Sequence, residues 1–171
     1  MRPLSYRNAA WLLVLFLIAG VIFIATPVGG DVLAARGSTP VSMEVAPDLA
    51  TFSATREVAE GENFPTGPFY IEGSLYPIGT LNADGTVPAD AEAIGTYRCW
   101  GWIVEGVSGA AVVNQSYELD DSGSILVNGY EATEFRIVTG GTGDFVGARG
   151  IGTTTAINAE NLTFSIAFDI E

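Results

Sequence analysis

Short runs of β-branched and aromatic residues, separated by turn-forming residues, are the feature that most limits how this chain can fold. From about residue 50 onward they recur every dozen or so positions, with Gly, Asn, Asp and Pro between them, and no helical period appears. The connections are too short for crossover helices, so neighbouring strands should pair antiparallel. The segment 120–123, Asp-Asp-Ser-Gly, is a tight hairpin turn. These patterns predict an all-β domain.

Eight strands are expected in this part of the chain. Their ranges are 50–58, 69–76, 94–105, 111–119, 124–130, 134–138, 148–157 and 162–170. Eight is about the number of strands that closes a small barrel, and such a barrel can hold one small ligand. We therefore predict an eight-stranded antiparallel barrel, with a two-sheet sandwich as the alternative.

The N-terminal segment predicts export. Arg2 and Arg7 precede an unbroken apolar run over 9–25, which is the pattern of a secretory signal and is also close to the length of a spanning helix. We expect a signal peptide or membrane-anchor helix at 1–30, a flexible spacer at 31–48 and the barrel at 49–171. The protein would be extracellular or periplasmic if the signal is cleaved, and membrane-anchored if it is not.

The charged residues exclude several classes of function. The chain has 7 basic and 20 acidic residues, every basic residue is Arg, and there is no His. Nucleic acid and anionic lipid are poor partners for such a domain because both need a basic patch. Contact with a membrane is therefore expected only through the N-terminal segment. We take the absence of His to exclude both a Ser-His-Asp enzyme and a zinc hydrolase.

The strand expected at 94–105 is apolar on both faces. Tyr97, Cys99 and Ile103 lie on one side, and Trp100 and Trp102 lie on the other. A strand with one solvated face would alternate more cleanly, so a subunit interface is the simplest cover for the second face. Cys99 is the only cysteine, and a lone thiol in an oxidising compartment survives best inside the core.

A glycine-rich stretch at 139–150, TGGTGDFVGARG, is the most distinctive motif. It is not a phosphate-binding loop. Such a loop ends in Gly-Lys-Ser/Thr and leads into a helix, whereas this stretch leads into another strand. We expect its glycines to form a tight corner between two strands, with Phe145 folded inward. A direct ligand contact, through Arg149, is the alternative.

This stretch, together with the hairpin at 117–129, resembles the second half of the dirigent and allene oxide cyclase superfamily. The resemblance extends over about 69–171 and implies an eight-stranded barrel. Plant allene oxide cyclases close a ring on an epoxide inside an apolar barrel, dirigent proteins steer radical coupling, and similar bacterial cyclases form spiro rings. None of these needs a metal or an organic cofactor, so no metal site and no cofactor are expected. Members are often trimers.

The resemblance also implies site residues. Cys99 is similar in position to a cysteine that lines the cavity, although it is equally a small core residue. The catalytic glutamate of the first strand corresponds most closely to Glu57, with Glu72 as a rival, and either could instead be a solvated surface residue. The residues expected to bind a ligand are Tyr97, Cys99, Ile103, Tyr117 and Arg149.

Two functions remain open. The first is an exported barrel that binds a small apolar molecule in its lumen, as a cofactor-free cyclase or isomerase or a stereo-directing protein. The second is a non-catalytic surface or cell-envelope module that uses the barrel for binding or assembly. A lumen filled by packed side chains, with no cavity beside Cys99, would refute the first.

Overall fold

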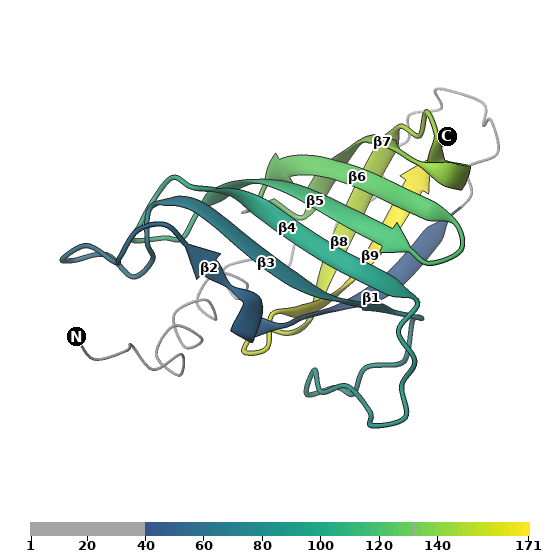
Figure 1. Cartoon of the computed structure of the whole chain (residues 1–171), viewed down its shortest axis with the longest axis horizontal. Coiled ribbons are helices and arrows are strands. Elements are labelled where there is room, and N and C mark those ends of the chain that lie inside the picture. The colour runs from purple at the N-terminus through teal and green to yellow at the C-terminus, as the bar shows by residue number, and fades with distance from the viewer. Residues whose placement is uncertain (1–39, 132) are drawn as a thin grey trace, which may run out of the picture.

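The computed structural model describes residues 40–131 and 133–171, which form one antiparallel sheet of nine strands (Figure 1). The strands are β1 (Val41–Pro47), β2 (Ser53–Ala54), β3 (Gly67–Tyr76), β4 (Gly95–Ile103), β5 (Ala111–Leu119), β6 (Gly123–Tyr130), β7 (Phe135–Gly141), β8 (Gly150–Asn158) and β9 (Thr163–Ile170). Two short 3-10 helices, η2 (Leu49–Thr51) and η3 (Gly143–Phe145), lie between strands.

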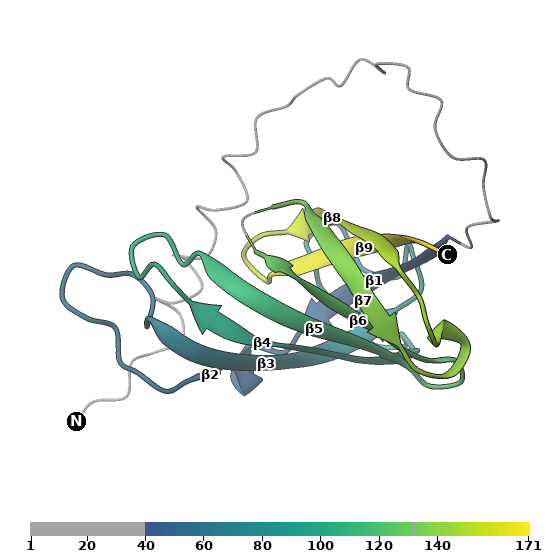
Figure 2. The ribbon, with the colours of Figure 1, turned by 90° about the horizontal axis from the view of Figure 1, so that it is seen from above.

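The sheet closes on itself. Its strand order is β1-β9-β8-β7-β6-β5-β4-β3-β2, and β1 pairs a second time with β3 through Val45 and Leu75. In Figure 1, β1 in blue lies beside β9 in yellow, where the first and last strands of the barrel meet. Seen from above, the strands wrap around a common interior (Figure 2). The predicted eight-stranded antiparallel barrel is confirmed, with β2 as a short addition to the edge of β3.

The first strand of the barrel is not where the sequence predicted it. The expected strand at 50–58 is only η2 and the two-residue β2, whereas β1 lies in Val41–Pro47, inside the expected spacer at 31–48. Met43 and Val45 are buried and alternate with Ser42 and Glu44, which is the period of a strand. The prediction of a spacer is therefore wrong for these residues, and the barrel begins at Val41 rather than at 49.

Aromatic side chains fill the middle of the barrel. The ring centroids of Tyr97 and Tyr117 lie 5.3 Å apart, Phe164 packs edge-on against Tyr97 at 5.7 Å, and Phe168 packs edge-on against Tyr117 at 5.1 Å. Edge-to-face packing at these separations is favourable beyond the area that it buries. These rings arrive from β4, β5 and β9, so the core joins strands from opposite parts of the wall.

The glycine-rich stretch forms the corner predicted for it. Gly143 and Gly147 have positive φ values of 59° and 84°, and η3 between them turns the chain from β7 into β8. Phe145 is partly buried and packs against the core cluster. Only residues without a side chain adopt these backbone angles at low cost, which explains why glycines accumulate here.

The N-terminal predictions concern residues outside the described ranges. The signal or anchor helix at 1–30 falls there entirely, so export remains a prediction. Within the residues that the structure does describe, no helix is long and apolar enough to span a bilayer.

Candidate functional site

Four polar side chains from β4 and β5 meet inside the barrel. Gln115 Nε2 donates a hydrogen bond of 3.1 Å to the Tyr97 hydroxyl, and the Tyr117 hydroxyl donates one of 3.0 Å to Gln115 Oε1. Cys99 is the cross-strand partner of Gln115 and interacts with both Gln115 and Tyr97. The prediction that Tyr97, Cys99 and Ile103 share the inner face is confirmed, since all three are buried.

The barrel is filled around this group. Cys99 is 1% exposed, Tyr97 and Gln115 are 3% exposed, and Tyr117 is fully buried. Side chains with so little accessible area border no void that could hold even a water molecule. A ligand cannot lie beside Cys99 in this conformation, so the expected cavity at that residue is absent.

The Cys99 thiol is also poorly suited to act as a nucleophile. Burial raises its pKa to about 12, although hydrogen bonds from Tyr97 and Gln115 act in the opposite direction. The thiolate is the reactive form of cysteine, and it is scarce at neutral pH when the pKa is this high. Of the two sequence interpretations of Cys99, the geometry supports a core residue.

Glu131 is an inward-facing acid that the sequence analysis missed. It follows the end of β6, its backbone N–H donates to Ala111 O at 2.8 Å, and it continues the inward alternation of Ile125, Val127 and Gly129. The residue keeps solvent-accessible area, yet burial raises the pKa of its carboxyl. Glu131 thus lies exposed at the rim of the barrel, close enough to the interior for its charge to raise the pKa of Tyr97, Cys99 and Tyr117.

Arg136 is a cation in the same interior. It lies on β7 two residues before the buried Val138, is 5% exposed, and is the register partner of Gly152. Its charge lowers the pKa of the Glu131 carboxyl and also acts on Cys99 and Tyr117. A buried base inside the barrel therefore lies close to an acid at its rim.

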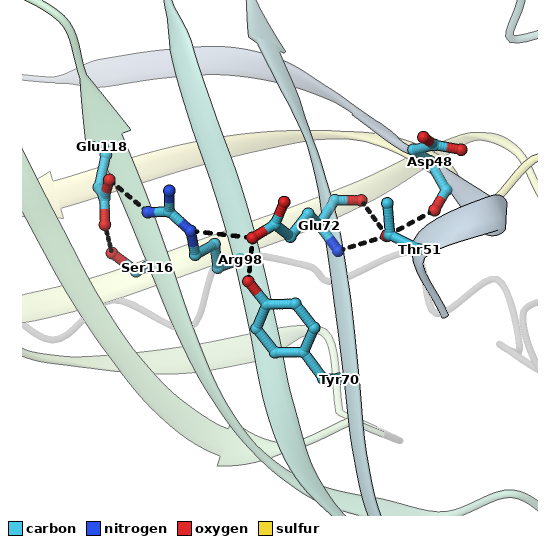
Figure 3. A network of polar contacts seen from close by, with 7 residues as sticks. All are labelled: Asp48, Thr51, Tyr70, Glu72, Arg98, Ser116 and Glu118. Atoms are coloured by element: carbon cyan, nitrogen blue, oxygen red, sulfur yellow. Dashed lines mark hydrogen bonds and ion pairs between the residues drawn. The ribbon is translucent and has the colours of Figure 1, made fainter. Parts of the chain in front are cut away.

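Glu72 lies on the outer surface, where it belongs to a ladder of polar contacts (Figure 3). It accepts hydrogen bonds from the Tyr70 hydroxyl and from Arg98 Nε, the latter at 3.3 Å, and Arg98 also pairs with Glu118. The hydrogen bond from Tyr70 is the largest cause that lowers the pKa of Glu72, so the carboxyl stays ionised. It braces β3, β4 and β5 from outside and cannot contact a ligand in the lumen.

Two further residues predicted for the site, Glu57 and Arg149, do not reach the lumen. Glu57 is exposed in the loop after β2, so it cannot be the inward acid that the resemblance implied. Arg149 is exposed, and its guanidinium donates to Ala148 O at 2.7 Å, which fits a brace for the glycine corner. A surface cavity of about 270 Å³ lies at the same end of the strands as the glycine corner, lined by Ala93, Ile94, Leu119, Asp120, Asp121 and Ser122.

The outer face of the barrel carries an apolar surface, which we call the outer apolar face. Trp100 and Trp102 are 41% and 51% exposed, so their predicted outward orientation is confirmed. Large exposed side chains continue across neighbouring strands: Val112, Leu126, Tyr130, Phe135, Ile137 and Ile151. Asn128 donates to Asn114 at 2.9 Å near its centre. Contiguous apolar surface of this kind is typical of an interaction site.

Comparison with known proteins identifies the fold. No protein-family model and no curated protein matches the sequence. Among solved structures, a pyocyanin demethylase matches with a TM-score of 0.54 and 14% identity, covering 78% of this chain and 100% of that one. Two pterocarpan synthase dirigent proteins match with TM-scores of 0.55 and 0.56 and 13% identity, covering 78% and 81% of this chain and 82% and 96% of theirs.

These likenesses are of fold, because the identities are low. Within the described residues, no group of three or more His, Cys, Asp and Glu side chains could hold a metal ion. The barrel closure, the glycine corner and the structural neighbours agree with the resemblance noted in the sequence. The chain has a dirigent-like β-barrel fold.

Proposed function

We propose that this protein binds a small, largely apolar molecule at the Glu131 side of its barrel interior. The observation that carries the proposal is Glu131, an acid on the inward alternation of β6 that is exposed at the rim while the neighbouring layer around Cys99 is packed. Ligand sites are mostly apolar with a few polar groups that fix orientation. The fold shared with pterocarpan synthase dirigent proteins supports a role in binding or steering a small molecule.

Glu131 also offers chemistry without a cofactor. A carboxyl whose pKa is raised by burial can donate and accept a proton closer to neutral pH than an exposed one. The activity that such a group fits best is an isomerisation or cyclisation in which the barrel fixes the substrate conformation. In this proposal Glu131 takes the role that the sequence had assigned to Glu57 or Glu72.

Binding of N-phenyl-1-naphthylamine, an uncharged dye whose fluorescence rises in apolar surroundings, tests the site. We expect saturable binding to the full-length chain, retained in Glu131→Gln and abolished in Glu131→Trp, whose bulky ring would block the proposed site. Thr153→Trp is the matched control, because Thr153 is exposed on the outer face of β8. Equal binding by the wild type and Glu131→Trp would refute a lumen site.

The outer apolar face favours the second candidate, an assembly module, and the two functions are compatible. We propose that a second copy of the chain covers this face, with a trimer as the form that the family resemblance implies. Light scattering on wild type and on a Trp100→Ser, Trp102→Ser double variant tests this: we expect an oligomer that dissociates in the variant. A monomeric wild type at micromolar concentration would refute it.

Export through the N-terminal segment is a further proposal, and N-terminal sequencing of secreted protein tests it.

A further inference from the structure

The connection between β3 and β4 is a long loop without helix or strand, residues 77–94. Connections between antiparallel strands usually have about 2–5 residues, and loops above about 12–15 residues without secondary structure are commonly lids, binding loops or linkers. This loop has a defined shape, because Gly85 N–H donates to Asn82 O at 2.8 Å and Asn82 N–H donates to Thr86 O at 3.1 Å. In Figure 1 it is the teal loop below β1. We call it the seam strap.

A carboxylate of β1 holds the first part of the seam strap. Glu44 alternates with the inward residues Met43 and Val45, so its side chain points away from the barrel interior, yet it is only 7% exposed. Its Oε1 accepts a hydrogen bond of 2.9 Å from Gly79 N–H, and its Oε2 accepts one of 2.7 Å from Leu81 N–H. No ion pair of the described residues involves Glu44, so backbone donors rather than a cation hold the carboxylate. Hydrogen bonds to an ionised acceptor are roughly twice as strong as neutral ones.

The tip of the seam strap packs on the turn between β8 and β9. Asn161 Nδ2 donates to Asp84 O at 3.0 Å. Gly85 is buried, and a Cβ there would stand 2.4 Å from Thr163 Oγ1 and 2.7 Å from the Cβ of Asn158. The strap therefore runs from the end of β3 across β1 to the ends of β8 and β9.

The strap crosses the place where the barrel wall closes between β1 and β3, which we call the seam. These strands pair in four positions, from Glu44 opposite Tyr76 to Pro47 opposite Gly73, whereas β3 pairs with β4 in nine. The pairing of β7 with β8 is equally short, but the corner that contains η3 joins these two strands directly. Glu44 is thus both a residue of the seam and the anchor of the strap.

We propose that the seam strap is a gate. While Glu44 holds the strap, β1 stays in the wall; when the strap releases, the seam opens and small molecules gain access to the packed interior. The layer around Cys99 borders no void, so a molecule reaches it through a local opening of the wall. Such an opening breaks few wall hydrogen bonds where the pairing is short. The gate does not depend on the proposed binding site, because it concerns the wall and not the ligand.

Labelling of the Cys99 thiol in the native full-length chain measures the opening of the interior. Cys99 is the only cysteine and is 1% exposed, so the uncharged reagent 4,4′-dithiodipyridine reacts when the wall opens. In Glu44→Gln an amide nitrogen replaces one carboxylate oxygen, so the strap loses at least one anchoring hydrogen bond. We expect this variant to be labelled at least about tenfold faster at about pH 8. Glu92→Gln is the matched control, because Glu92 is exposed in the same strap, and it should be labelled at the wild-type rate.

Amide hydrogen exchange, followed by mass spectrometry, shows whether the opening is local. In Glu44→Gln, peptides covering 41–47 and 73–81 should exchange faster, while those covering β4 and β5 should keep the wild-type rate. Asn161→Ala, which frees the tip of the strap, should change the same peptides and the labelling rate in the same direction, and it decides the question if Glu44→Gln does not fold. Unchanged labelling together with fast exchange in the strap would overturn the gate. Equal increases in every strand would also overturn it, because Glu44 would then stabilise the barrel as a whole.

Discussion

The buried Cys99 thiol should make the protein lose stability at alkaline pH by an amount that can be calculated. Burial raises its pKa from 9.0 to about 12 in the folded protein, so the unfolded chain loses the thiol proton first. A group with a raised folded pKa contributes stability below its unfolded pKa and loses that contribution as pH rises through the folded value. The contribution is therefore complete at neutral pH and declines between about pH 9 and 12.

The size of the effect follows from the two pKa values. At about pH 10.5 the unfolded thiol is almost fully ionised and the folded thiol almost fully protonated, which lowers the free energy of unfolding by ~2 kcal/mol relative to pH 8. The chain contains no Lys, so the other side chains that titrate in this range are its six tyrosines. Burial is the largest cause of the raised pKa of Tyr97 and Tyr117 and is common to the wild type and the variant, whereas the smaller effect of the Cys99 charge on both is lost in the variant.

Urea unfolding of the wild type and of Cys99→Ala at about pH 8 and pH 10.5 measures this contribution. We expect the variant to be less stable at pH 8, because it leaves a small cavity, and the difference to shrink by ~2 kcal/mol at pH 10.5. Thiol labelling of the native wild type should also be at least on the order of a thousandfold slower than that of an exposed cysteine. A difference in stability that does not change with pH would refute the burial argument and return Cys99 to the list of reactive residues.

Three further predictions follow from the geometry. Glu131→Gln should increase the free energy of unfolding at pH values above about 4.5, the ordinary pKa of a carboxyl, and leave it nearly unchanged at lower pH. The reason is that the raised pKa of Glu131 makes its ionisation unfavourable to folding, and urea unfolding between about pH 4 and 8 measures the effect. Glu72→Gln should leave dye binding in the lumen unchanged while making the thermal midpoint less sensitive to salt, because the pair with Arg98 is on the surface; an equal loss of dye binding would contradict its outward placement. Phe168→Ala should cost about 3–5 kcal/mol of stability, measured by urea unfolding, because it removes a buried ring packed on Tyr117; a cost below about 1 kcal/mol would mean that the barrel centre is not packed.

The position of the acid illustrates what the sequence analysis could not provide. The strand ending at Tyr130 was predicted correctly, and extending its alternation by one residue would have placed Glu131 on the inner face. Turn residues break the period-two rule often enough that such an extension is uncertain without the closed wall around it. Glu57 was chosen by analogy to the first strand of other barrels, with Glu72 on the second expected strand as its rival, and the position of the first strand was wrong.

The prediction of the first strand failed for a local reason. Pro and Gly residues around Val41–Pro47 made a spacer the natural prediction, although Met43 and Val45 already alternate with polar residues. What makes this segment a strand is pairing with both β9 and β3, and these partners lie far away along the chain. Closure of the barrel supplies the hydrogen bonds that local propensity does not.

The sequence by itself determined the antiparallel all-β architecture, the inward side of Tyr97 and Cys99 and the outward side of Trp100 and Trp102, because alternation and turn residues act over a few positions. It also determined a net charge of −13, which disfavours nucleic acid as a partner. Only the tertiary structure decided that the layer around Cys99 is packed, that Arg136 is buried and that Glu131 lies at the rim. These properties depend on which strands close the wall and how much space their side chains leave, and residues distant in sequence set both.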